Sequence, residues 1–547
     1  MTGPHTLPRA LRRAATTYAG HPAVVDGGTR LTWGELLEEV RATARGYAAL
    51  GLRPGDRVAI WAPNGWEWVV AGLAVSYAGA TLVPLNTRYK GAEVADVVER
   101  TGAVLLVVAD GFLGRRQLDE LSEAAGELAR ASELGAESDV IEGLPSVRAV
   151  VRIGEGSSPG TTPFADLASV GASVDPAAIE AVADAVSPDD VADILFTSGT
   201  TGRSKGVVTA HRQTISAAQV WGSTGELSAD DRYLVISPFF HTYGYKVGIV
   251  ACVLTGATLY PMATFDTDAV LSLIAEERIS VVPGATAIFH SLLESPAFHE
   301  TDTSSLRLAN TGASVVPVAL VERMQNELGF DLVLTAFGMT ECVMGTMCRP
   351  GDPDDVVANT CGRAVEGHEV RIVDPATGEV RGPGEEGELH LRGPMVMLGY
   401  LDDPEATAEA IDADGWLHTG DVGVVDEAGY LRITDRLKDM YISGGFNVYP
   451  AEVEQALARL EGVVESAVVG VPDARMGEVG KAFVVRREGA DLGEDDVIAF
   501  ARERIANFKV PRQVEFIDAL PRNLGGKVLK NELRDGAGVL PRESKEN

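Results

Sequence analysis

Two distant stretches of this sequence repeat one pattern, and the repetition constrains the fold more than any other feature. Residues 55–63 (GDRVAIWAP) lead through an apolar segment to 79–84 (GATLVP), and residues 230–238 (DDRYLVISP) lead in the same way to 256–261 (GATLYP). Each unit is typical of a strand, a helix, a glycine stop and a second strand. The nearly continuous apolar strands suit a parallel sheet that is covered on both faces. The repetition therefore predicts an α/β fold with two related subdomains.

The remaining sequence adds two further units. Residues 367–400 alternate short β-type runs with Gly/Pro turns, which predicts a small β-rich subdomain. After Asp435 the pattern changes to the short strands and helices of an α+β module. We therefore expect a large N-terminal domain over residues 1–436, followed by a small mobile C-terminal domain over residues 437–547. The tail from residue 535 onward is expected to be disordered.

The charge and the apolar runs exclude several classes of protein. A formal net charge of −32 argues against nucleic acids and anionic membranes as partners. Residues 247–265 carry no charge and are long enough to span a bilayer, but Gly256 and Pro261 interrupt them, so we expect a buried helix that runs into a buried strand. The four cysteines form no CxxC pair, and the first 13 residues hold no apolar signal-peptide core. These features predict a reduced, cytoplasmic protein, with a homodimer left open.

The stretch 197–206 (TSGTTGRSKG) has the composition of a loop that wraps a polyphosphate. Glycines let backbone N–H groups approach a ligand closely, hydroxyl groups donate hydrogen bonds, and a lysine neutralises charge. The stretch nevertheless differs from the phosphate loop of P-loop NTPases. Ser204 occupies the position of the second glycine, and Gly206 follows Lys205 where that motif has Ser or Thr. The loop therefore indicates a nucleotide site of another kind.

Three more stretches place charged side chains near glycine turns. At 335–341 (TAFGMTE) a carboxylate follows the turn and suits a hard cation that holds phosphates. At 415–421 (GWLHTGD) an aspartate could accept both hydroxyl groups of a ribose. Residues 435–454 join a charged run to a Gly-Gly turn (DRLKD, then GGFNVYPAEVE). Each stretch alone is more often a solvated loop, so their order along the chain decides the interpretation.

In this order the stretches resemble the motifs of the adenylate-forming superfamily, which contains acyl-CoA synthetases, adenylation domains and luciferases. The resemblance extends from 31–36 (LTWGEL) to 521–527 (PRNLGGK), which is nearly the whole chain. Ser204 and Phe337 stand where the family usually has proline and tyrosine, and neither change removes a charged or metal-binding group. The resemblance implies an ATP-dependent acyl-CoA ligase. Such an enzyme joins a carboxylic acid to coenzyme A through an acyl-adenylate, requires Mg²⁺, and releases AMP and diphosphate.

The resemblance also implies roles for individual residues. The residues expected to hold the β- and γ-phosphates of ATP are Thr197, Ser198, Gly199, Thr200, Thr201, Gly202 and Lys205. Those expected around the adenine are Gly312, Ala313, Ser314, Phe337 and Gly338. Thr340 and Glu341 would contact the α-phosphate and Mg²⁺, with Glu341 as the metal ligand, and Asp421 and Arg436 would hold the ribose. The residues presented to the pantetheine of coenzyme A would be Gly444, Gly445 and Phe446.

Two lysines near the C-terminus have contrasting expected roles. Lys527 resembles the family's catalytic lysine, which pairs with the carboxylate and the α-phosphate during adenylation. An exposed loop lysine is the ordinary alternative, and the intact Pro-Arg-x-x-x-Gly-Lys pattern favours the catalytic role. Lys438 follows Arg436 by two positions, where the family has its hinge. There the small domain would rotate after adenylation, withdrawing Lys527.

The segment 238–246 (PFFHTYGYK) resembles the family's acyl-side motif, in which His241 would act as an aromatic gate. A core histidine is the alternative. Lys246 could extend along the surface to water, or it could meet a polar group such as a ketone in the acyl site. The Tyr245-Lys246 pair, 345–350 (GTMCRP) and 439–447 (DMYISGGFN) resemble an actinobacterial branch of steroid-catabolism ligases. Members of this branch activate a bicyclic keto-propanoate (HIP).

Two other functions remain open at this point. A medium- or long-chain fatty acid–CoA ligase would use the same residues with a different pocket. A non-catalytic nucleotide sensor should lack the small-domain lysine, and Lys527 is present. A peptide-synthetase adenylation domain would place an aspartate near the start of residues 239–249 to hold an amino group, and the sequence has none there.

Overall fold

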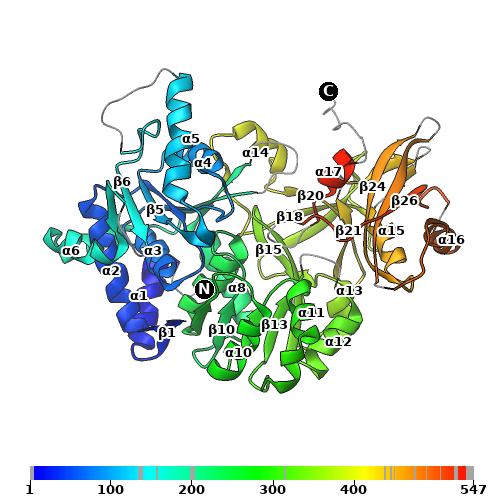
Figure 1. Cartoon of the computed structure of the whole chain (residues 1–547), viewed down its shortest axis with the longest axis horizontal. Coiled ribbons are helices and arrows are strands. Elements are labelled where there is room, and N and C mark those ends of the chain that lie inside the picture. Colours follow the sequence, from blue (N-terminus) through cyan, green and yellow to red (C-terminus); the bar gives the residue numbers. More distant parts are fainter. Residues whose placement is uncertain are drawn as a thin grey trace.

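The computed structural model describes most of the chain (Figure 1). The described residues are 5–132, 140–154, 158–197, 204–312, 316–436, 439–443, 446–448, 450–473, 476–487, 489–505, 507–522 and 528–536. The expected disordered tail therefore lies almost entirely outside them.

The first α/β subdomain is built on a mainly parallel sheet. In spatial order its described strands are β19 (Gly399–Tyr400), β9 (Gly206–Ala210), β8 (Val191–Phe196), β4 (Thr81–Pro84), β3 (Arg57–Trp61), β5 (Leu105–Ala109), β6 (Ala149–Ile153) and β7 (Thr161–Pro163). Its helices are α1 (Leu7–Thr17), α2 (Trp33–Ala49), α3 (Trp66–Tyr77), α4 (Gly91–Thr101), η1 (Phe112–Gly114), α5 (Gln117–Ser132), η2 (Phe164–Asp166), α6 (Leu167–Val170), η3 (Gly171–Ser173), α7 (Pro176–Ala185) and α8 (His211–Thr224). Side chains alternate between two cores: Val58 and Ile60 face the large core shared with the second subdomain, whereas Ala59 and Trp61 pack with α4 and α5.

The second α/β subdomain contains the other large sheet. In spatial order its described strands are β16 (Arg363–Ala364), β15 (Cys342–Met347), β14 (Leu332–Met339), β13 (Leu308–Thr311), β12 (Val281–Pro283), β10 (Arg232–Val235), β11 (Thr258–Pro261), β1 (Pro22–Asp26) and β2 (Thr29–Thr32). Its helices are η4 (Tyr243–Val250), α9 (Ala251–Thr255), α10 (Thr267–Glu277), α11 (Thr286–Glu294), η5 (Pro296–Glu300), α12 (Val318–Asn326) and α13 (Asp354–Asn359).

The two repeated sequence units form equivalent βαβ units in the two sheets, as predicted. In each unit the strands are parallel, and the proline that ends the second strand pairs with a residue at or next to the end of the first: Pro84 with Ile60, and Pro261 with Val235. The uncharged run 247–265 forms the second half of η4, then α9 and β11, so the prediction of a buried helix leading into a buried strand is confirmed. No described helix combines the length and apolarity that crossing a bilayer requires.

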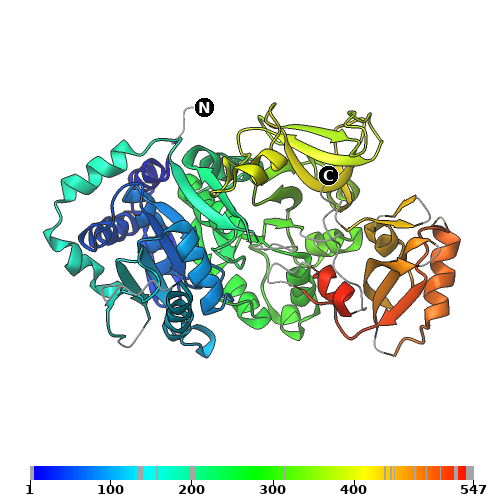
Figure 2. The ribbon, with the colours of Figure 1, turned by 90° about the horizontal axis from the view of Figure 1, so that it is seen from above.

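The β-rich subdomain and the C-terminal domain are also present. The former contains β17 (Glu369–Val373), β18 (Gly387–Arg392), β20 (Leu417–Val425), β21 (Leu431–Arg436) and α14 (Pro404–Ala410). The latter contains β22 (Tyr441–Ser443), β23 (Phe446–Val448), α15 (Pro450–Leu457), β24 (Val463–Asp473), β25 (Gly477–Arg486), α16 (Glu494–Arg504), β26 (Gln513–Phe516) and α17 (Lys530–Gly536). Figure 2 shows this small domain, orange to red, at one end of the molecule. The predicted fold class is confirmed.

Candidate functional site

The base of the glycine- and hydroxyl-rich loop lies at the carboxyl end of β8. The backbone N–H of Thr197 donates to the carbonyl of Lys205 at 3.0 Å, which closes the loop where β8 and β9 pair. Lys205 is exposed and Thr197 is half-buried. The loop's middle, residues 198–203, lies outside the described residues, and with it the predicted contacts of Ser198, Gly199, Thr200, Thr201 and Gly202.

The predicted metal carboxylate lies at the tip of a tight hairpin. Strands β14 and β15 are antiparallel, with Met339 paired to Cys342, so Thr340 and Glu341 form the connection. A Cβ atom at Gly338 would lie 1.9 Å from the carbonyl oxygen of Val343, so only glycine fits this close crossing. Thr340 is half-buried and Glu341 is buried. The hairpin therefore fixes where the carboxylate lies.

Tyr400 joins the hairpin to the phosphate loop, a connection that the sequence did not reveal. Its phenol donates to Oε1 of Glu341 at 2.8 Å, and Nζ of Lys205 lies 4.8 Å from the centre of its ring. Tyr400 reaches this position because β19 pairs with β9, the strand that follows the loop. Burial, followed by the neighbouring charge of Glu341, raises the pKa of Tyr400, so the phenol keeps its proton and can donate. Lys205 and Glu341 thus belong to one cluster.

The two predicted ribose residues are brought together. Asp421 in β20 pairs with Arg436 at the end of β21. Asp421 is buried, and its backbone N–H donates to Oγ1 of Thr419 at 3.1 Å. Gly420, immediately before Asp421, has φ of +68°, a left-handed conformation that favours glycine. The turn therefore sets the direction of the Asp421 carboxylate.

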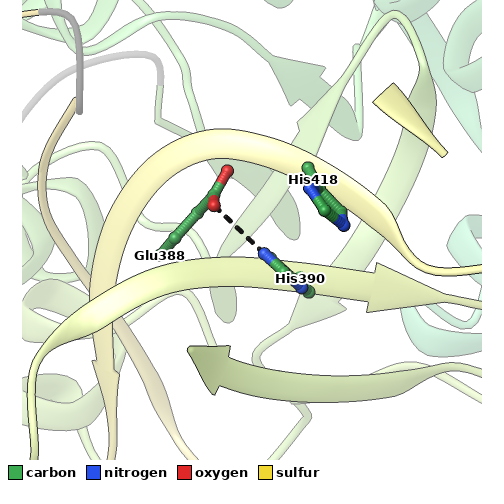
Figure 3. A group of neighbouring side chains, drawn as sticks. All are labelled: Glu388, His390 and His418. Atoms are coloured by element: carbon green, nitrogen blue, oxygen red, sulfur yellow. Dashed lines mark hydrogen bonds and ion pairs between the residues drawn. The ribbon is translucent and has the colours of Figure 1, made fainter. Parts of the chain in front are cut away.

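A group of titratable side chains supports this turn (Figure 3). Glu388 and His390 on β18 lie beside His418 on β20, with the two histidines paired across the strands. Glu388 Oε2 contacts His390 Nε2 at 3.1 Å, and its Oε1 accepts the N–H of Gly420 at 3.1 Å. Glu388 therefore holds the turn that carries Asp421.

This group is poorly suited to bind a metal ion. The rings of His390 and His418 are stacked, with centroids 4.0 Å apart and planes inclined by 13°. Parallel rings direct their nitrogen lone pairs along parallel lines, so one ion cannot lie in the plane of both rings. The guanidinium of Arg371 also contacts Nδ1 of His390 at 3.2 Å and adds positive charge. We therefore assign the group a structural role.

His241 lies on an exposed turn just before η4. Its Nδ1 accepts the backbone N–H of Tyr243 at 3.2 Å, so in the neutral ring the proton is on Nε2. Asn64 fixes this turn from the other βαβ unit, because its amide accepts from Phe239 N at 2.8 Å and donates to Ser237 O at 3.0 Å. The core-histidine alternative does not fit, since the residue is exposed.

Lys246 takes neither of the two roles considered from the sequence. Its side chain is 1 % exposed, which rules out an extension to water. Nζ lies 2.8 Å from Oδ1 of Asp193 on β8 and 2.7 Å from the hydroxyl of Thr209 on β9. Asp193 also accepts from Thr209 at 2.5 Å and from Thr214 at 2.7 Å. The ammonium group is therefore neutralised by a buried carboxylate instead of meeting a ketone, and it ties η4 to the strands that flank the phosphate loop.

The other predicted site residues are described in part. Gly312 follows β13, and Phe337 and Gly338 lie at the end of β14, so the structure brings these predicted adenine-side positions to neighbouring strand ends. Phe446 begins β23. The predicted residues outside the described part of the chain are Ala313, Ser314, Lys438, Gly444, Gly445 and Lys527.

Comparisons with known proteins agree with this arrangement. Residues 11–401 match the family model for the AMP-binding enzyme, and residues 452–527 match that for the AMP-binding enzyme C-terminal domain. The chain is 55% identical over 97% of its length, and 99% of the relative's, to a 3-[(3aS,4S,7aS)-7a-methyl-1,5-dioxo-octahydro-1H-inden-4-yl]propanoyl:CoA ligase of Rhodococcus jostii. The protein of the same name from Mycobacterium tuberculosis is 54% identical, covering 97% of this chain and 98% of the relative. ATP-bound MatB from Rhodopseudomonas palustris superimposes with a TM-score of 0.84 at 31% identity, covering 97% of this chain and 98% of that one. The chain therefore belongs to the family of AMP-binding enzymes, and it is an AMP-forming acyl-CoA ligase.

Proposed function

We propose that the enzyme converts a bicyclic keto-propanoate, ATP and coenzyme A into the acyl-CoA, AMP and diphosphate. The observation that carries this proposal is the 55% and 54% identity over 97% of the chain to two ligases whose name specifies a methyl-dioxo-octahydroindenyl propanoate. Identity at this level, over nearly the full length of both chains, supports a shared substrate class.

The chemistry follows from the poor reactivity of a carboxylate. A free carboxylate would have to expel oxide, so its oxygen first attacks the α-phosphorus of ATP and diphosphate leaves. The thiol of coenzyme A then attacks the acyl carbon of the adenylate, and AMP leaves. Lys205 and the loop at 197–206 would hold the departing diphosphate, and Asp421 with Arg436 would hold the ribose. Lys527 would neutralise charge between the carboxylate and the α-phosphate.

The residues at the β14–β15 hairpin fit a magnesium ion. Glu341 offers a carboxylate, the ligand type that a hard cation prefers, and one of its oxygens is already oriented by Tyr400. Thr340, beside it, would contact the α-phosphate. Mg²⁺ bound there would supply positive charge that offsets the charge of the phosphates.

The thioester step would use the small domain in a second orientation. We propose a domain boundary after Arg436, with Lys438 as the hinge; in support, β21 ends at Arg436 and the next described strand, β22, begins at Tyr441. Rotation there would withdraw Lys527 and present Gly444, Gly445 and Phe446 to the pantetheine of coenzyme A. A few backbone dihedrals are enough to absorb such a closure. A cytoplasmic location also stays a proposal, consistent with the free cysteine thiols. A homodimer stays a proposal as well.

A panel of acids tests the proposal. AMP release that depends on coenzyme A is measured with the dioxo-octahydroindenyl propanoate, with the same ring system lacking its ketones, and with straight-chain acids of medium and long length. The proposal predicts the highest kcat/KM for the diketone. A preference for a straight-chain acid would instead support a fatty acid–CoA ligase. Binding of ATP without release of AMP would support a nucleotide sensor.

A further inference from the structure

Half-buried Tyr243 and buried Asn310 form a polar pair between the acyl-side segment and the nucleotide side of the site. The phenol of Tyr243, the first residue of η4, donates to Oδ1 of Asn310. Asn310 lies near the carboxyl end of β13, two residues before Gly312, and carboxyl ends of parallel strands are where ligands bind in α/β sheets. Its backbone is fixed as well, because the Asn310 carbonyl accepts from Gly284 N at 2.9 Å.

The pair has hydrogen-bond donors without an acceptor. Asn310 is 4 % exposed, and its Nδ2 is buried without a partner among the described residues. Buried amide groups almost always find a partner, so an orphaned one indicates a group that binds there. Exchanging the amide nitrogen and oxygen would change which donors are left over but would not remove the surplus, because a phenol and an amide together carry three N–H or O–H donors.

The surplus donors are uncharged, and this restricts the ligand. Burial raises the pKa of Tyr243, so the phenol stays protonated. The cation of the same helix, Lys246, is already paired with Asp193. With neutral donors, and with Lys246 already paired, the described part of the site disfavours a carboxylate, which would lose hydration without gaining a counter-charge. It suits a neutral acceptor such as a ketone oxygen.

We infer that Asn310, held by Tyr243, recognises a ring ketone of the acyl substrate by donating a hydrogen bond from Nδ2. This inference rests on the proposed function, because it needs a substrate that carries a ketone on its ring system. Asn310 then touches the substrate, whereas Tyr243 orients the amide. Selectivity arises because an acid without the ketone leaves the buried N–H unpaired.

The test compares Asn310→Leu with the unaltered enzyme on three acids: the dioxo-octahydroindenyl propanoate and its two analogues that each lack one ketone. We expect Asn310→Leu to lower kcat/KM for the diketone by about 10- to 100-fold. For one of the two analogues kcat/KM should change less than about threefold, and this analogue identifies the recognised ketone. KM for ATP should not change. Tyr260→Phe is the control, because this buried tyrosine on β11 bonds to Glu277 at the end of α10.

Four outcomes would overturn the inference. An equal loss on all three acids would mean that Asn310 only supports the fold. If Asn310→Leu does not fold, Tyr243→Phe keeps the ring and removes the bond to Asn310, and an unchanged preference for the diketone would then contradict the inference. If the unaltered enzyme prefers straight-chain acids, the proposed function fails first and ketone recognition fails with it. If it prefers the diketone and the variants keep that preference, only the inference fails.

Discussion

Replacing Lys246 by methionine should destabilise the enzyme far more than removing an equally short ion pair at the surface. Lys246 and Asp193 lie 2.8 Å apart with side chains 1 % and 0 % exposed. Arg323 and Glu327 lie 2.7 Å apart on α12 with side chains 37 % and 43 % exposed. Removing one partner of a buried pair leaves an uncompensated charge and costs about 3–5 kcal/mol, whereas an exposed helical pair contributes about 0.3–0.5 kcal/mol.

The surroundings of Asp193 reduce the stability cost that we expect for Lys246→Met to the lower end of about 3–5 kcal/mol. Thr209 and Thr214 still donate to the carboxylate after Lys246 is removed, so the charge keeps part of its hydrogen bonding. We therefore expect about 3 kcal/mol for Lys246→Met, and a smaller cost for Lys246→Met combined with Asp193→Asn, because the double variant buries no charge. Lys246→Met should lower activity on keto and straight-chain acids by the same factor, since Lys246 does not contact a ketone.

Native-state hydrogen exchange is the suitable assay, because a chain of this size does not unfold in one step. The amides of β8 and β9 should lose protection by about 100-fold in Lys246→Met, which corresponds to about 3 kcal/mol. The control Arg323→Met should change protection in α12 by less than about threefold. Equal, small effects of the two variants would refute the claim that the buried pair holds η4 to these strands.

Three further predictions concern the site and the pH dependence. Tyr400→Phe removes the bond to Glu341 but keeps the ring near Lys205, so we expect kcat/KM for ATP to fall by about tenfold. The control Tyr430→Phe removes a phenol–carboxylate bond to Asp352 and should leave kcat/KM for ATP unchanged. Equal effects of the two variants would contradict the role of Tyr400. Burial lowers the pKa of His211 to about 4, so this residue stabilises the fold above the unfolded pKa of about 6.5, and the contribution is lost as the pH falls toward 4. The contribution amounts to about 3 kcal/mol. His211→Asn should therefore flatten this part of the stability profile, measured as native-state hydrogen exchange of the α8 amides at pH 7 and pH 4.5. An unaltered profile would show that another group causes the loss. Lys527→Ala should abolish adenylate formation, measured as exchange of diphosphate into ATP, and spare thioester formation from preformed adenylate; equal loss of both steps would contradict its assignment.

Much of the fold could be predicted because its signals are local. The repeated units carry their strands, glycine stops and prolines within short windows, and both form parallel βαβ units. The same holds for the hairpin at Glu341 and for the turn at Asp421, where glycines fix the backbone within a few residues of the functional side chain.

The contacts that complete the site depend on pairs distant in sequence, so no single window reveals them. Lys246 appears in the sequence as a lone charge beside an apolar run, and its partner Asp193 lies on a strand of the other subdomain. Tyr400 reaches Glu341 only because β19 adds to the edge of the first sheet. The amide of Asn310 becomes notable only once its burial and its missing partner are known.

A competition experiment measures the substrate preference of the enzyme. The unaltered enzyme receives ATP, coenzyme A and equal concentrations of the dioxo-octahydroindenyl propanoate and a straight-chain acid of similar size, and the two acyl-CoA products are measured by mass spectrometry at low conversion. We predict that the diketone product exceeds the straight-chain product by at least about tenfold. Equal amounts, or an excess of the straight-chain product, would contradict it.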